Sequence, residues 1–308
     1  ISREFKMKDM GEPSLCLGMK IKYDQQSKTT SISQHHYIQQ MLSDFNMTDC
    51  KPARTPLPSN YTNIPLREDE EGGEEPFGTL VGKLLYAATR TRPDIAVAVS
   101  MLCGHMRKHS KQHWTAAKHV LRYLKGTSNA TIQYNGTANA YLSAFSDASY
   151  ATDPVKCRSR TGYVLFFASG PVSWHTKLQP TIATSSAEAE YMALTQTAKE
   201  IQYLRSFIEE LTGSEILEPT TIHADNTASI KVATSSSTRM KHIKIRFHFI
   251  KQCIEEGTVT LQYCPTEHMT ADILTKALGK DKQDKFRRAL LNDSTTAHTF
   301  SSTTSTDI

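Results

Sequence analysis

Two features that would place this 308-residue chain in other protein classes are missing. No uninterrupted apolar run approaches the ~18 residues of a membrane-spanning helix, so no membrane association is expected. No charged segment followed by an apolar one begins the chain, so no signal peptide is expected. The first residue is Ile1 rather than Met, which indicates a fragment or a processed product. The length corresponds to one large or two ordinary domains.

The six cysteines are scattered, and no Cys-x-x-Cys pair occurs. This spacing argues against a disulfide scaffold and against a structural zinc site. We expect reduced thiols that pack as small apolar side chains, in a reducing compartment such as the cytosol or the nucleus.

Charge is distributed unevenly along the chain, whose formal net charge is +5. Residues 68–75 hold six acids and no base, whereas residues 77–126 hold nine bases and one acid, Asp94. A basic excess is typical of a polyanionic partner or of a surface that is merely soluble, and the local imbalance favours a surface that faces phosphates. The candidate nucleic-acid contacts in this segment are Arg90, Arg92, Lys108, Lys118, Arg122 and Lys125.

Hydrophobic periodicity divides the chain into five segments. Residues 1–57 read as short strands followed by a helix, and residues 58–76 form an acidic linker. Residues 77–136 read as helical, with a proline at the start of the helix that follows Arg92. Residues 140–280 mix strands and helices, and residues 281–308 comprise a helix end and a disordered Ser/Thr tail.

The segment 140–280 has the order of a mixed α/β domain. Strands are predicted over 140–145, 162–168, 172–175, 220–224 and 258–263. Helices are predicted over 186–210, 227–233 and 242–256, and a last helix is predicted to begin at 271.

Four acids lie at junctions of these elements, where a mixed sheet would bring them together. Asp147 lies at the end of the first strand, Glu190 lies one turn into the long helix, Asp225 ends the fourth strand, and Asp272 opens the final helix. Two Mg²⁺ ions ~3.5–4 Å apart require converging oxygen ligands of this kind.

Glu188 and Glu190 compete for the position on the long helix. Ser185 and Glu188 form a Ser-x-x-Glu capping box, so Glu188 closes the start of the helix. Glu190 points about 200° away around the helix and is free to face the sheet. We therefore select Glu190.

From Asp147 to Leu278 the sequence resembles the ribonuclease H domain of copia-class LTR retrotransposon Pol polyproteins. The matching motifs are Ser146-Asp-Ala, Arg158-Ser-Arg-Thr-Gly-Tyr163, Gly170-Pro-Val-Ser-Trp174, Ser185-Ser-Ala-Glu-Ala-Glu-Tyr191, Ala224-Asp-Asn226, Lys241-His-Ile243, Arg246-Phe-His-Phe-Ile250 and Ala271-Asp-Ile-Leu-Thr-Lys276. Residues 5–57 resemble the end of a reverse-transcriptase palm and the start of its thumb, and residues 77–126 resemble the thumb and connection.

The resemblance implies an α/β fold with a ribonuclease H-like mixed five-stranded sheet and flanking helices. A mainly helical thumb/connection region with a short β segment would precede it. Asp147, Glu190, Asp225 and Asp272 would be the metal ligands for two Mg²⁺ ions, with Mn²⁺ as an alternative. The implied activity is hydrolysis of the RNA strand of an RNA:DNA hybrid. The implied location is a cytoplasmic virus-like particle, with the nucleus as a second site.

The resemblance also implies residues that contact nucleic acid or assist catalysis. The further candidates for nucleic-acid contact are Arg158, Asn226, Lys241, His242, Lys244, Arg246 and His248. At Lys244 the family usually has Asp, which makes this predicted helix more basic. His268 is the candidate for a catalytic or product-release histidine, and His242 and His248 compete for that role.

The chain lacks the Tyr-x-Asp-Asp carboxylates that this family places just upstream. DNA synthesis is therefore expected only together with the upstream palm and fingers of the parent polyprotein. An alternative hypothesis is a catalytically inactive or domesticated nucleic-acid-binding relic. An integrase is discounted, because its acids run Asp-Asp-Glu and the order here is Asp-Glu-Asp-Asp.

Overall fold

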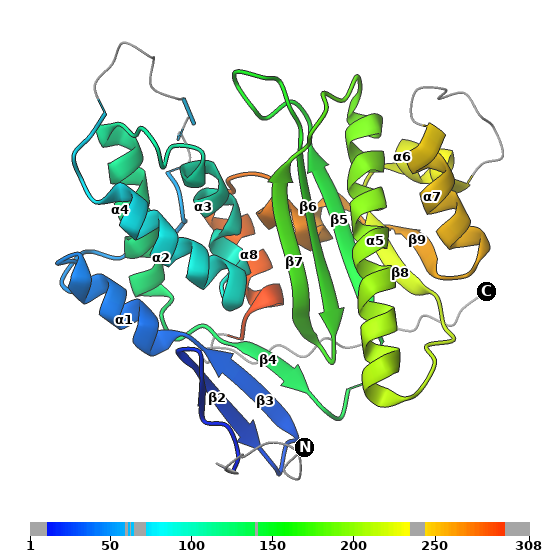
Figure 1. Cartoon of the computed structure of the whole chain (residues 1–308), viewed down its shortest axis with the longest axis horizontal. Helices are drawn as coiled ribbons and strands as arrows, with labels where there is room; N and C mark the ends of the chain where they lie inside the picture. Colours follow the sequence, from blue (N-terminus) through cyan, green and yellow to red (C-terminus); the bar gives the residue numbers. More distant parts are fainter. Residues whose placement is uncertain are drawn as a thin grey trace, which may run out of the picture.

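A computed structural model describes residues 11–58, 61, 63–64, 72–138, 141–234 and 244–292, with the side chains of 244–248 left out. The described chain forms a small sheet, a helical region and a larger sheet covered by helices (Figure 1). No helix within these ranges has both the length and the apolar character needed to cross a membrane.

The small sheet contains four antiparallel strands in the order β1-β2-β3-β4. Its strands are β1 (Leu15–Cys16), β2 (Met19–Asp24), β3 (Thr29–Ser33) and β4 (Ile132–Asn135). The short β segment that was expected is therefore larger than predicted. Its fourth strand comes from the segment predicted as helical, where Ile132 pairs with Ile32 of β3.

The helical region packs around one hydrophobic core. It contains α1 (His35–Asp44), α2 (Phe77–Arg90), the 3₁₀ turn η1 (Pro93–Ile95), α3 (Ala96–Cys103) and α4 (Lys111–Gly126). Leu80 and Leu84 of α2 are fully buried in this core with Val120 of α4. Pro93 stands at the first position of η1, as its sequence context predicts.

The larger sheet has the order β7-β6-β5-β8-β9. Its strands are β5 (Ser143–Ser149), β6 (Arg160–Phe167), β7 (Gly170–Leu178), β8 (Thr220–Ala224) and β9 (Val259–Tyr263). Strands β5, β6 and β7 are antiparallel neighbours, while β8 is parallel to both β5 and β9. The expected mixed five-stranded sheet of a ribonuclease H-like fold is confirmed.

Helices cover both faces of this sheet (Figure 1). One core joins it to α5 (Ser186–Thr212), α6 (Thr227–Thr234) and α7 (Lys244–Glu255). The opposite core contains the 3₁₀ turn η4 (Thr270–Leu274) and α8 (Lys280–Leu290). The helix predicted to begin at 271 is wrong, because this segment forms η4 and the α-helix starts only after Gly279.

Among the described residues, two side-chain hydrogen bonds join the helical region to the larger sheet. The Trp174 indole N–H of β7 donates to the Ala88 carbonyl of α2 (2.8 Å), and Arg160 Nη1 of β6 donates to Ser100 Oγ of α3 (2.8 Å). Arg160 is 4% exposed. The helical region and the sheet therefore meet at an interface with specific hydrogen bonds as well as apolar packing.

Candidate metal centre

Three of the four predicted acids converge at one place on the larger sheet. One carboxylate oxygen each of Asp147, Glu190 and Asp225 lies within 4.8 Å of the other two. Asp147 comes from the middle strand, Glu190 from the second turn of α5, and Asp225 from the residue after β8. Asp147 and Glu190 are buried, while Asp225 is half-buried.

The sequence placed Asp147 at the end of the first strand. In the structure it lies inside β5, two residues before the last residue of that strand. The polar residues Ser146, Asp147 and Ser149 hide the second half of this strand from a search for apolar residues, although its backbone is fully paired with β6. The capping box predicted for Ser185 and Glu188 forms only in part. Ser185 Oγ accepts from the Glu188 N–H, whereas the Glu188 carboxylate accepts from the Thr184 N–H (2.7 Å), one residue before the N-cap.

Asp272 lies beside the triad but outside its close group. Its side chain is fully buried in η4, and its negative charge acts on Asp147. Asp272 Oδ1 lies 2.8 Å from Lys276 Nζ, and Asp272 Oδ2 lies 3.9 Å from Lys282 Nζ. Neither oxygen has a hydrogen bond of good geometry among the described residues, so the two ammonium groups are its polar neighbours.

Gly162 allows the turn carrying Asp272 to pack onto the sheet. Gly162 pairs with Asp147 across β5 and β6. A Cβ at this position would lie 2.6 Å from Thr275 Cγ2 and 2.9 Å from the Leu274 carbonyl carbon. Only glycine leaves room for this close approach, so the Arg-Ser-Arg-Thr-Gly motif positions the fourth acid indirectly.

Burial of the acids changes their proton affinity. Desolvation, followed by the charges of Asp147 and Asp225, raises the pKa of Glu190 to about 9. Desolvation and the neighbouring Asp272 charge also raise the pKa of Asp147. These carboxylates repel one another unless protons or cations neutralise them. A bound cation would relieve this repulsion, so the arrangement favours cation binding.

Three further residues in the site were not predicted. The Thr275 hydroxyl donates to Asp147 Oδ2, the Thr266 hydroxyl donates to Asp225 Oδ2 (2.9 Å), and Lys276 pairs with Asp272. Thr275 and Lys276 belong to the Ala-Asp-Ile-Leu-Thr-Lys motif that was used for the resemblance. The motif was therefore recognised in the sequence. The sequence alone did not show that the Thr275 side chain contacts Asp147 or that the Lys276 side chain contacts Asp272.

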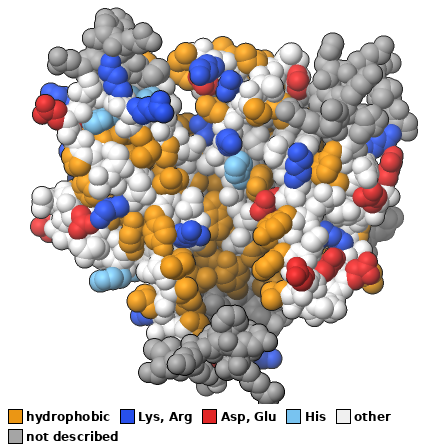
Figure 2. Space-filling view, in the orientation of Figure 1, with side chains coloured by type: hydrophobic (Ala, Val, Ile, Leu, Met, Phe, Trp, Pro, Cys, Tyr) orange, Lys and Arg blue, Asp and Glu red, His pale blue; other side chains and the backbone are white. Residues whose placement is uncertain are grey.

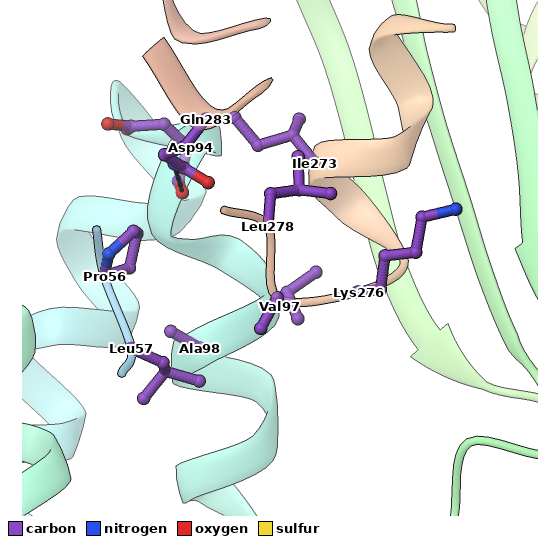
Figure 3. A pocket seen from close by; sticks show the side chains of 10 residues that line it. Pro56, Leu57, Asp94, Val97, Ala98, Ile273, Lys276, Leu278 and Gln283 are labelled. Carbon is purple, nitrogen blue, oxygen red and sulfur yellow. Dashed lines mark hydrogen bonds between the residues drawn. The ribbon is translucent and has the colours of Figure 1, made fainter. Parts of the chain in front are cut away.

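Figure 3 shows the direction of the Lys276 side chain. Lys276 borders a cavity of about 10 Å³ between η4 and the helical region, which is also lined by Leu57, Asp94, Val97 and Gln283. The Lys276 ammonium points out of this cavity, on the side of the neighbouring strands.

The assignment of Arg92 to nucleic-acid contact is wrong. Its side chain is completely buried and forms a two-pronged pair with Asp94, from Nε to Oδ1 (2.9 Å) and from Nη2 to Oδ2 (2.7 Å). Arg92 Nη1 also donates to the Thr127 carbonyl, and the Tyr123 hydroxyl donates to Asp94. Arg92 therefore connects η1 to α4 inside the protein and cannot reach a phosphate.

Three other candidates have structural partners. Arg122 Nε donates to the Lys51 carbonyl (2.7 Å), and Lys125 Nζ donates to the Cys50 carbonyl (2.7 Å), so both hold the segment after α1 against α4. Asn226 Oδ1 accepts from the Ser229 N–H at the start of α6 (2.9 Å). These hydrogen bonds within the protein use part of the hydrogen-bonding capacity of each side chain, so the presence of these residues does not by itself require a nucleic-acid ligand.

The remaining described basic candidates lie at the surface. Arg90 is exposed above the Tyr86 ring, Lys118 lies above Trp114, and Lys108 and Arg158 are half-buried. On the face shown in Figure 2, Lys and Arg side chains stand apart among other side chains rather than in one continuous patch. Contact of these residues with nucleic acid stays a prediction.

Five candidates lie where side chains are not described. Lys241 and His242 fall outside the described residues, and for Lys244, Arg246 and His248 only the α7 backbone is described. His268 is exposed in the 3₁₀ turn η3 (Thr266–His268), and its Nδ1 lies 3.4 Å from Lys285 Nζ. η3 also carries Thr266, which bonds Asp225, so a role for His268 remains a prediction.

Comparison with known proteins identifies the chain's relatives. Residues 1–59 match the family model described as reverse transcriptase (RNA-dependent DNA polymerase). The retrovirus-related Pol polyprotein from transposon TNT 1-94 of Nicotiana tabacum is 35% identical over 290 residues, which are 92% of this chain and 22% of the relative. The polyprotein from transposon RE1 of Arabidopsis thaliana is 33% identical over 293 residues, 93% of this chain and 19% of the relative.

One similar solved structure is that of LC11-RNase H1, isolated from compost by a metagenomic approach. It is 16% identical, with a TM-score of 0.35, over 47% of this chain and 97% of that one.

The order and directions of the strands in the larger sheet, with its flanking helices, define a ribonuclease H-like fold. The sequence relationships define it further. The chain belongs to the copia-class retrotransposon Pol polyproteins and corresponds to their C-terminal part, from the end of the reverse transcriptase through the ribonuclease H-like domain. It spans about a fifth of the length of the two Pol relatives named above.

Proposed function

We propose that this chain is a metal-dependent endonuclease that hydrolyses the RNA strand of RNA:DNA hybrids. The observation that supports this most directly is the convergence of Asp147, Glu190 and Asp225 from three separate elements to within 4.8 Å. A purely structural role would not require three acids to be held together at a cost in repulsion and desolvation.

The donor set fits a hard divalent cation. All the candidate ligands are carboxylate oxygens, which Mg²⁺ and Mn²⁺ prefer over nitrogen and sulfur ligands. Asp147, Glu190 and Asp225 would hold one ion, and Asp272 with Asp147 would hold a second. Such ions supply a water nucleophile near neutral pH and stabilise charge at the reacting phosphate.

The protein's own groups would fix the orientation of these ligands. The Thr275 hydroxyl bonds one oxygen of Asp147, and the Thr266 hydroxyl bonds one oxygen of Asp225. Each bond leaves the other oxygen of the carboxylate available and restricts its rotation. Ligands held in this way lose less conformational freedom when a cation binds.

The polyprotein relationship supports further proposals about the context of the activity. DNA polymerisation would require the upstream palm and fingers of the parent chain. The hybrid would be held by basic side chains such as Arg90, Lys108, Lys118 and Arg158, and RNA would be distinguished from DNA by its 2′-OH. The protein would act in a cytoplasmic virus-like particle and in the nucleus.

Cleavage of a labelled RNA strand in an RNA:DNA hybrid, with and without MgCl₂, tests the proposal. Glu190→Gln is expected to lower the cleavage rate by more than about 100-fold, because it removes a charged ligand. Glu188→Gln is the matched control on the same helix, two residues away, and should retain the activity.

Wild-type protein that binds the hybrid but does not cleave it in MgCl₂ would support the binding relic instead. Equal cleavage by Glu190→Gln and wild type would contradict the assignment of the site.

A further inference from the structure

Lys276 places a positive charge among the four acids. Its Nζ lies 2.8 Å from Asp272 Oδ1, and its charge acts on Asp147, Glu190 and Asp225. Lys276 belongs to the stretch just after η4, four residues beyond Asp272. The Lys276 ammonium therefore partly neutralises the negative charge of the four acids.

The two partners of this ion pair differ in their freedom to move. The Asp272 side chain is fully enclosed, whereas the Lys276 side chain is 40% exposed. An ammonium on a flexible four-carbon stem can swing into solvent at small cost, but a buried carboxylate cannot follow it. If the pair separates, Asp272 stays in the site and is available to another cation.

A divalent ion and the lysine ammonium would compete for the same oxygen atoms. Among the described residues, Asp272 has no hydrogen bond of good geometry to a neutral donor. Its neutralisation therefore depends on Lys276 and, more distantly, on Lys282. Two cations at one carboxylate also repel each other, so binding of one weakens binding of the other.

We propose that Lys276 is the resident counter-cation of the acidic site: its ammonium pairs with Asp272 in the metal-free protein and leaves Asp272 when a divalent ion binds there. This inference rests on the proposed function, because it requires that the four acids bind metal. It assigns Lys276 the role of a positioning residue that keeps the acids together until the metal arrives.

Isothermal titration of the full chain with MgCl₂, after treatment with EDTA, tests the proposal on wild type, Lys276→Met and Lys282→Met. Removing Lys276 removes the competitor, so Lys276→Met is expected to bind Mg²⁺ at least about fivefold more tightly. Lys282→Met is the graded comparison, since this lysine lies 3.9 Å from Asp272 Oδ2 and is half exposed, and its removal should raise the Mg²⁺ affinity clearly less than Lys276→Met does.

Thermal unfolding separates this role from a merely structural one. Lys276→Met should unfold at a lower temperature than wild type in EDTA and should regain most of the difference in saturating MgCl₂. Lys276→Arg keeps the charge and should bind Mg²⁺ with an affinity close to that of wild type. Lys276→Arg also remains informative if Lys276→Met does not fold without metal. Much tighter Mg²⁺ binding by Lys276→Arg than by wild type would refute the role of the positive charge.

The outcomes distinguish this inference from the function on which it rests. Unchanged or weaker Mg²⁺ binding by folded Lys276→Met would overturn the role of Lys276 and leave the nuclease proposal standing. Absence of Mg²⁺ binding in both wild type and Lys276→Met would overturn the proposed metal-dependent function and, with it, the inference.

Discussion

Neutralising Glu190 should make the metal-free protein more stable at alkaline pH. The Glu190 side chain is 6% exposed, and burial together with the charge of Asp147 raises its pKa to about 9. An acid whose pKa is higher in the folded than in the unfolded protein contributes stability below its unfolded pKa. That contribution is lost as pH rises toward the folded pKa. Glu190→Gln keeps the shape of the side chain and removes this dependence.

The magnitude follows from the two pKa values. With a pKa of 4.5 in the unfolded chain and about 9 in the folded protein, wild type should lose about 4 kcal/mol relative to Glu190→Gln between pH 5 and pH 8. This comparison cancels the contributions of titrating groups that lie too far from Glu190 to interact with it.

Urea unfolding in EDTA at several pH values from 5 to 9 measures the effect. The difference in the free energy of unfolding, variant minus wild type, should grow steadily with pH, whereas Glu188→Gln should give a difference that does not vary with pH. A wild type and Glu190→Gln that respond equally to pH would show that folding does not raise the pKa of Glu190 in the metal-free protein. The electrostatic account of the site would then be refuted.

Two further predictions concern the helical region. Asp94→Asn removes the charged partner of the fully buried Arg92, and we expect it to lower the free energy of unfolding by about 3–5 kcal/mol in urea titrations; a loss below about 1 kcal/mol, typical of surface pairs, would contradict the buried pair. His105 stacks on His113 and has a pKa lowered to about 4 by burial, so its contribution to stability is present above pH 6.5 and is lost as pH falls toward 4. His105→Gln should remove about 3 kcal/mol of the acid-induced loss seen in wild type over that interval, and identical acid unfolding of the two proteins would exclude the effect.

The sequence predicted the order of strands and helices in the larger sheet because hydrophobic periodicity and capping are local properties. Glu190 was separated from Glu188 by the capping-box motif alone. The structure places Glu188 against Thr184 at the start of α5 and Glu190 close to Asp147 and Asp225. The polar strand around Asp147 and the 3₁₀ turn around Asp272 were harder to predict from the sequence. Both depend on contacts across the sheet, such as the space left at Gly162.

The basic residues were harder to interpret than the acids, for a physical reason. Acids that serve a metal must converge, so their positions at the ends of strands and starts of helices constrain one another. A basic side chain can face solvent, a phosphate, a carbonyl or a buried acid, and these alternatives look the same in a charge count. Arg92 illustrates this: its partners Tyr123 and Thr127 in the buried network lie on or just after α4, about 30 residues away along the chain.

The hydrogen-bond and ion-pair partners of the basic residues weaken the interpretation of residues 77–126 as a phosphate-binding surface. The nine bases of residues 77–126 would suggest a strongly positive surface. Arg92 is neutralised inside the protein by Asp94, while Arg122 and Lys125 hold the carbonyls of Lys51 and Cys50. Part of the excess therefore serves to attach the segment after α1 to α4 and to anchor η1. A positive charge count in a small helical region is evidence for phosphate contact only after the internal acceptors of each side chain have been identified.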